Sequence, residues 1–90
     1  MNLPQQLKIG GHIYSIIEVE NHDLTDNDTL GACDPETNTI SILKSLSPSQ
    51  KEATLVHEVL HAMNWSLEEE MVEGLAQQLH QVITDNNLLK

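Results

Sequence analysis

Three residues of one short segment could together perform metal chemistry. His57 and His61 stand four positions apart in TLVHEVLHAMNW, and Glu58 directly follows the first histidine. In a helix, side chains at positions i and i+4 lie on one face, so both imidazoles could bind one metal ion. The glutamate would then stand beside the ion, where it could accept a proton from a water molecule instead of binding the metal. The pattern therefore predicts a zinc site with Glu58 as general base.

A simpler interpretation makes these histidines ordinary polar residues of an amphipathic helix. On a helical wheel, Thr54, His57, Glu58 and His61 fall within about 100° of one another, opposite a continuous apolar half. A lone histidine in such a place would usually face solvent. The complete His-Glu-x-x-His pattern arises by chance only roughly once in 40 sequences of this composition, so we favour the metal site.

A catalytic zinc site needs a third protein ligand, because such sites hold zinc with three protein groups and leave one position for water. The short link at residues 64–66 predicts an antiparallel helical hairpin. His57 and His61 stand just before this link, so their partner should lie one to two turns into the second helix. Glu73 meets this condition. Glu69 lies closer to the helix start and is better explained as a capping residue.

The helical wheel does not separate the alternatives for the third ligand, because Glu69, Glu73 and His80 lie together along one border of the apolar arc. His80 could instead donate a hydrogen bond to an oxyanion, as could Tyr14, although a surface role for His80 is equally expected. Cys33 is a soft metal ligand in principle, but a buried strand cysteine is the more common case.

Several strands precede the helices and must position them. LKIGGHIYSIIEVE predicts two strands joined by a turn at Gly10 and Gly11. A third short strand is expected at residues 29–33, after a polar loop at 21–28. In TISILKSL, apolar residues alternate with polar ones, as in a half-buried strand. Ninety residues suffice for one domain, so we expect a single α+β domain over 1–90. Its three- to four-stranded sheet would pack on two long antiparallel helices.

The two helices carry their own start signals. Either Ser47 or Ser49 can cap the first helix, with Glu52 three residues after Ser49 in capping-box spacing. Ser66 is the expected cap of the second helix. We expect the apolar arc of the second helix to be buried. This arc comprises Leu67, Met71, Val72, Leu75, Ala76, Leu79, Val82 and Ile83.

The charge balance limits the partners. The formal net charge is −10, and such a field repels both nucleic acid and anionic membrane surfaces. We therefore expect a protein or peptide partner. The single Cys33 leaves no internal disulfide and fits a reducing compartment, and no apolar run approaches the roughly 18 residues of a membrane span. The N-terminus has no apolar stretch typical of a signal peptide, so a cytoplasmic location is expected.

TLVHEVLHA followed by EEEMVEGLAQQL resembles the zincin metallopeptidases, and most closely the small single-domain group of phages and prophages related to the ImmA/IrrE type. The resemblance implies a third ligand within a Glu-x-x-Ala segment, which Glu73 to Ala76 matches, and so supports Glu73 over Glu69. It also implies that LGACDPETNTISI forms an edge strand beside the active site, where a substrate backbone would bind by strand addition. Without a second subdomain, the cleft would be shallow.

These observations predict a zinc-dependent peptidase, phage-encoded and acting in the host cytoplasm, in which His57, His61 and Glu73 bind Zn²⁺ and Glu58 is the general base. The alternative is a non-catalytic, zinc-stabilised protein-binding module, whose metal would be closed off by a fourth ligand. The candidates for that ligand are Cys33, His80 and Glu69. A third interpretation, an acidic decoy for a DNA-binding protein, has only the net charge in its favour.

Overall fold

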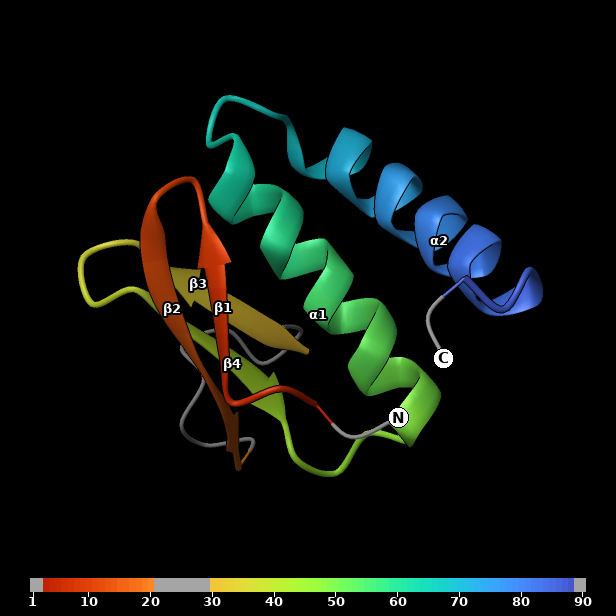
Figure 1. The fold of residues 1–90 in the computed structure, drawn as a ribbon, viewed down its shortest axis with the longest axis horizontal. Coiled ribbons are helices and arrows are strands. Elements are labelled where there is room, and N and C mark those ends of the chain that lie inside the picture. The colour runs from red at the N-terminus through yellow and green to blue at the C-terminus, as the bar shows by residue number, and fades with distance from the viewer. Residues whose placement is uncertain (1–2, 21–29, 89–90) are drawn as a thin grey trace.

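The computed structural model describes residues 3–20 and 30–88, and within them it shows the expected α+β fold (Figure 1). The polar loop predicted at 21–28 and the first residue of the strand predicted at 29–33 lie outside this range. The elements, in chain order, are β1 (Gln6–Ile9), β2 (His12–Val19), β3 (Gly31–Asp34), β4 (Thr39–Leu43), α1 (Pro48–Met63) and α2 (Glu69–Asp85).

The four strands form one mixed sheet in the order β1-β2-β4-β3. β1 and β2 are an antiparallel hairpin, and its turn is at Gly10 and Gly11, as predicted. Both glycines have positive φ, 58° and 88°, which a two-residue hairpin turn of the primed type requires. β4 pairs in parallel with β2 and antiparallel with β3. Because β3 pairs only with β4 among the described strands, it forms one edge of the sheet.

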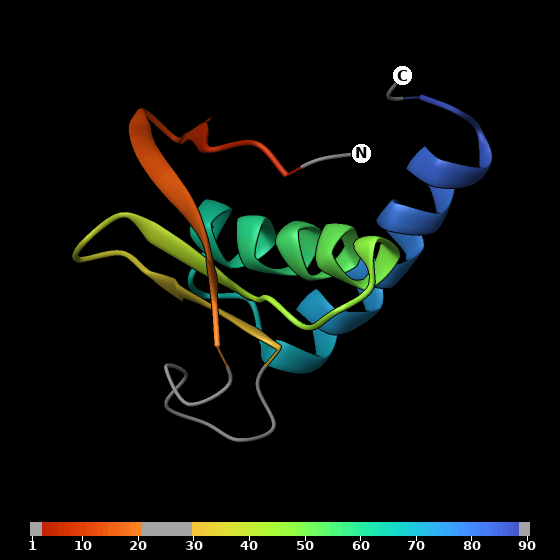
Figure 2. The same cartoon turned by 90° about the horizontal axis from the view of Figure 1, so that it is seen from below.

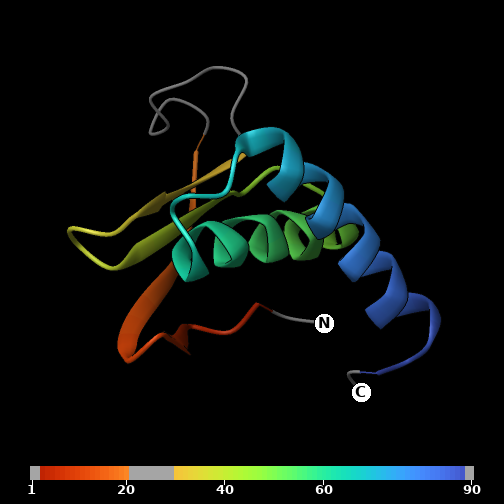
Figure 3. The same ribbon diagram turned by 90° about the horizontal axis from the view of Figure 1, so that it is seen from above.

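The sheet, α1 and α2 form three successive layers, with α1 in the middle. α1 packs against β1, β3 and β4, whereas α2 packs mainly against α1 (Figures 2 and 3). The predicted alternation in β4 is confirmed, because Ile40 and Ile42 are fully buried between the sheet and α1. The main core cluster consists of Ile9, Tyr14, Ile16, Ile40, Ile42 and Leu55.

Of the two serines that could cap α1, Ser47 does so. Its hydroxyl accepts a hydrogen bond from the backbone N–H of Gln50, and the Gln50 side chain accepts one from the Ser47 N–H. The expected cap of α2 at Ser66 is wrong, since α2 begins at Glu69 and has Glu68 as its N-cap. Ser66 instead donates hydrogen bonds from its backbone N–H and its hydroxyl to the Asn64 side chain. The link between the helices is therefore longer than expected.

The apolar arc of α2 is largely exposed, contrary to the expectation that it is buried. Only Val72 and Ala76 are buried, because α2 rests on α1 along one edge of the arc. Exposed fractions of 43–53% are found for Met71, Leu75, Leu79 and Val82. Among the described residues, neither helix is long and apolar enough to cross a membrane.

Candidate metal centre

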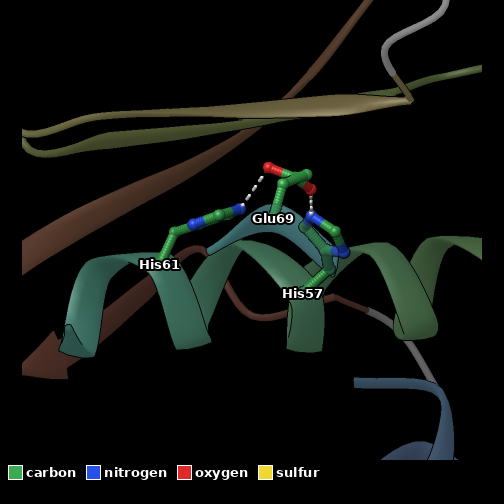
Figure 4. Close-up of side chains that lie close together, drawn as sticks. All are labelled: His57, His61 and Glu69. Atoms are coloured by element: carbon green, nitrogen blue, oxygen red, sulfur yellow. Dashed lines mark ion pairs between the residues drawn. The ribbon is translucent and has the colours of Figure 1, made fainter. Parts of the chain in front are cut away.

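His57, His61 and Glu69 converge between the two helices (Figure 4). One carboxylate oxygen of Glu69 lies 2.6 Å from Nε2 of His57, and the other lies 2.9 Å from Nε2 of His61. One ligand atom from each of the three residues can be chosen so that all lie within 4.8 Å of one another. Two imidazoles and one carboxylate are ligand types that suit zinc, so this donor set fits a divalent metal ion.

The local structure explains why these three residues meet. His57 and His61 are one turn apart on α1, and their ring centroids are 4.9 Å from each other. The chain then reverses, and Glu69 is the first residue of α2, where the helix dipole favours a carboxylate. The ring of Trp65, in the link between the helices, stacks on His61 at 6.2 Å with an interplanar angle of 20°. This contact helps to fix the orientation of the His61 ring.

For the third ligand, the structure reverses the order of preference between Glu73 and Glu69. Glu73 lines the same cavity as the two histidines but does not belong to the converging group. The expectation counted helical turns from a start at Ser66. The cap of α2 lies two residues further along, at Glu68, and residues 64–68 form a non-helical link after which Glu69 lies opposite the histidines; Glu73 lies one turn beyond it. The geometry thus favours the residue that the sequence ranked second.

Glu58 lines the cavity beside this group and is 7% exposed. Within the described chain its carboxylate makes no hydrogen bond or ion pair, and since no buried side-chain oxygen there lacks a partner, its oxygens open onto the cavity. Burial raises the pKa of Glu58 from 4.5 to about 7, with nearby His57 acting in the opposite direction and Glu69 raising it further. A carboxylate that exchanges a proton near neutral pH is suited to general acid–base chemistry.

β3 closes the cavity on the sheet side by an unusually close approach to α1. A Cβ atom on Gly31 would lie 2.7 Å from Cγ2 of Thr54 and 2.8 Å from the carbonyl oxygen of Ser41. Only glycine fits this position without movement of the backbone. Thr54 is buried here, and its hydroxyl donates to the carbonyl of Gln50 within α1. The lone glycine in LGACD was the only sequence signal for this contact.

The other residues considered for the site lie elsewhere. His80 contacts Glu52 at 3.3 Å, at the opposite ends of the two helices from His61 and Glu69. Tyr14 is a core residue, and burial raises the pKa of its hydroxyl. Cys33 is on β3 and does not line the cavity; burial, followed by the charges of Glu58 and Asp34, raises the pKa of its thiol to about 11.

The cavity that holds these groups has a volume of about 580 Å³. Its lining residues are Leu30, Gly31, Ala53, Thr54, His57, Glu58, His61, Glu69, Glu73 and Gln77. The fold and this cavity define a small α+β protein with a His-His-Glu group fit for a divalent metal. Searches against protein-family models, curated proteins and solved structures find no match for the chain.

Proposed function

We propose that the protein is a zinc-dependent peptidase in which His57, His61 and Glu69 hold the metal and Glu58 is the general base. One observation supports this proposal above all others. Two imidazole Nε2 atoms and a carboxylate converge next to a buried carboxylate that has no hydrogen-bond partner in the described chain. The combination provides metal ligands and a proton acceptor in the same cavity.

A bound zinc ion would polarise the scissile carbonyl and make a water molecule more acidic. Glu58 would take the proton from that water and deliver it to the leaving amine. Its raised pKa of about 7 suits both steps, because a general acid–base group works best near the operating pH. The outer edge of β3, next to Gly31 in the cavity wall, offers backbone groups on which an extended peptide could pair.

Zinc titration of the metal-free protein, followed by calorimetry and metal analysis, tests the ligand set. We expect one zinc ion per chain in the wild type and in Glu73→Gln, and a loss of affinity of at least tenfold in His57→Ala and Glu69→Gln, since each loses a ligand. Zinc should also raise the melting temperature of the wild type, because an ion that binds only the folded state stabilises it. Unchanged affinity in Glu69→Gln would contradict the assignment.

The role of Glu58 is tested by Glu58→Gln, with peptide cleavage followed by mass spectrometry on a library of proteome-derived peptides. The variant should keep its zinc and lose cleavage by a factor of at least a hundred, as expected for removal of a general base. Cleavage that survives in contaminant-free Glu58→Gln protein would refute the mechanism.

A second candidate function is a non-catalytic, zinc-stabilised protein-binding module. It is favoured by the position of Glu73, which lines the same cavity and could supply a fourth ligand. X-ray absorption spectroscopy on the zinc-loaded protein separates the two, since the peptidase needs a coordination position for water. With either function, the protein would act in the cytoplasm, since a single cysteine fits a reducing compartment. If the gene is carried by a phage, this would be the cytoplasm of the host.

A further inference from the structure

The cavity extends beyond the His57, His61 and Glu69 group. On the side away from the link, α1 contributes Ala53 and Thr54 to its wall, and α2 contributes Glu73 and Gln77. Glu73 follows Glu69 by one helical turn, about 6 Å along the axis. Glu73 is exposed, and Ala53, which lines the same cavity from α1, has a short side chain.

The charges around this part of the cavity are unbalanced. Three carboxylates line the cavity, and no lysine or arginine does. A divalent ion held by Glu69 beside Glu58 would be balanced by those two groups, which leaves the charge of Glu73 uncompensated. Glu73 has no ion pair or hydrogen bond to another described residue.

The buried carboxylate of Glu58 shows that this is more than a group of surface acids. Glu58 is more than nine-tenths buried, borders the same cavity, and has no hydrogen-bond partner within the described chain. No buried side-chain oxygen of the described residues is without a partner, so the Glu58 oxygens open onto the cavity, where a ligand or water can pair with them. The cavity therefore has the character of a binding site, in which the groups next to Glu58 face the bound molecule.

We propose that Glu73 forms a subsite for a cationic side chain, and that the substrates are peptides with arginine or lysine next to the scissile bond. The proposal rests on the peptidase function proposed above. Adjacent residues of an extended peptide are about 3.3 Å apart, so the long side chain of a neighbouring residue can reach one helical turn from the metal. A carboxylate binds a guanidinium group with two parallel hydrogen bonds, which neutral side chains cannot reproduce.

The test measures peptide binding, which does not require turnover. The protein is zinc-loaded Glu58→Gln, and the probes are the end-blocked peptide Ala-Ala-Arg-Ala-Ala and the same peptide with citrulline, the uncharged isostere of arginine. We expect about tenfold tighter binding of the arginine peptide, measured by NMR titration. Adding Glu73→Gln should remove this preference. Adding Glu70→Gln, which removes an exposed charge from the same helix outside the cavity, should leave it intact.

Three results would overturn the subsite: equal binding of the two peptides, including no detectable binding of either; a preference that persists in Glu73→Gln; or loss of zinc from Glu73→Gln, which would make Glu73 a ligand. The proposed function fails separately. If the zinc-loaded wild type cleaves no peptide of the library but the arginine preference depends on Glu73, the subsite stands and the peptidase function does not. Cleavage without preference for arginine or lysine refutes only the subsite.

Discussion

The polar face of α1 and the apolar face of α2 lie in the opposite environments from those their composition suggests. On α1, Thr54 and Glu58 are only 8% and 7% exposed. On α2, Met71 and Leu75 have about half of their surface in solvent. Two amphipathic helices that look alike in sequence therefore make very different contributions to the fold.

The cause is the order of the layers. α1 lies between the sheet and α2, so β3 and the first turn of α2 cover its polar face. α2 is on the outside of the molecule and packs mainly against α1, and of its residues only Val72 and Ala76 are buried. Position in the stack, more than helical periodicity, decides which side chains are buried.

Both faces lower the stability of the fold. Burial of the Glu58 carboxylate without a partner opposes folding, whereas the exposed apolar side chains of α2 contribute less than buried ones would. Departures from the usual rules tend to coincide with functional sites. The departure on α1 involves groups that can bind a metal and transfer a proton, which is why the proposed function is assigned to that face.

The largest effect is expected from Glu58→Gln in the metal-free protein. The folded-state pKa of about 7 exceeds the ordinary value of 4.5, so the folded state holds this proton more tightly. Stability from this group is fully present below pH 4.5 and is lost as the pH rises through 7. Relative to Glu58→Gln, the wild type should lose on the order of 3 kcal/mol of unfolding free energy between these limits.

Urea unfolding with a chelator present, repeated from pH 4.5 to pH 8, measures this difference. Glu70→Gln is the control, since it removes an exposed carboxylate from α2 and should follow the wild-type pH profile. Parallel profiles for the wild type and Glu58→Gln would mean that burial of Glu58 does not oppose folding.

A smaller effect is expected where β3 covers the polar face of α1. Gly31→Ala would force the β3 backbone away from Thr54 and Ser41, at a cost of about 1–3 kcal/mol. The matched variant is Gly74→Ala on α2, where a Cβ atom meets nothing within 4 Å. It should stabilise the protein by about 0.5–1 kcal/mol through the better helix propensity of alanine. Urea unfolding of both variants measures these changes. A Gly31→Ala variant as stable as the wild type would contradict the close approach of β3 to α1.

Much of the fold was predictable from the sequence because its signals are local. The Gly10-Gly11 turn and the alternation around Ile40 each depend on a few neighbouring residues, and the start of α1 was narrowed to Ser47 or Ser49, although its capping box uses Gln50 and not Glu52. The relation between His57 and His61 was also predictable, because both belong to one helix with a fixed geometry. These parts of the structure follow from periods of two and 3.6 residues.

The third member of the group was harder to predict because it depends on where a second helix begins. The N-cap lies at Glu68 and not at Ser66, and with this longer link it is Glu69 that faces the histidines. Capping preferences of about 1 kcal/mol decide such a boundary, and the Asn64 side chain competes for the Ser66 hydroxyl. The exposure of the apolar arc of α2 was equally inaccessible, since periodicity identifies an apolar arc without revealing how much of it another element covers.

The smallest effects are expected within the apolar arc of α2, which has one buried side and one exposed side. Val72 is fully buried against α1, so Val72→Ala should cost about 2 kcal/mol for two lost methyl groups and the cavity they leave. Leu75 is half exposed, and Leu75→Ala should cost less than about 1 kcal/mol although it removes more carbon atoms. Urea unfolding of the metal-free variants at one pH gives both values. If Leu75→Ala were the more destabilising of the two, the outer face of α2 would have to be covered in solution, and the contrast between the two helices would disappear.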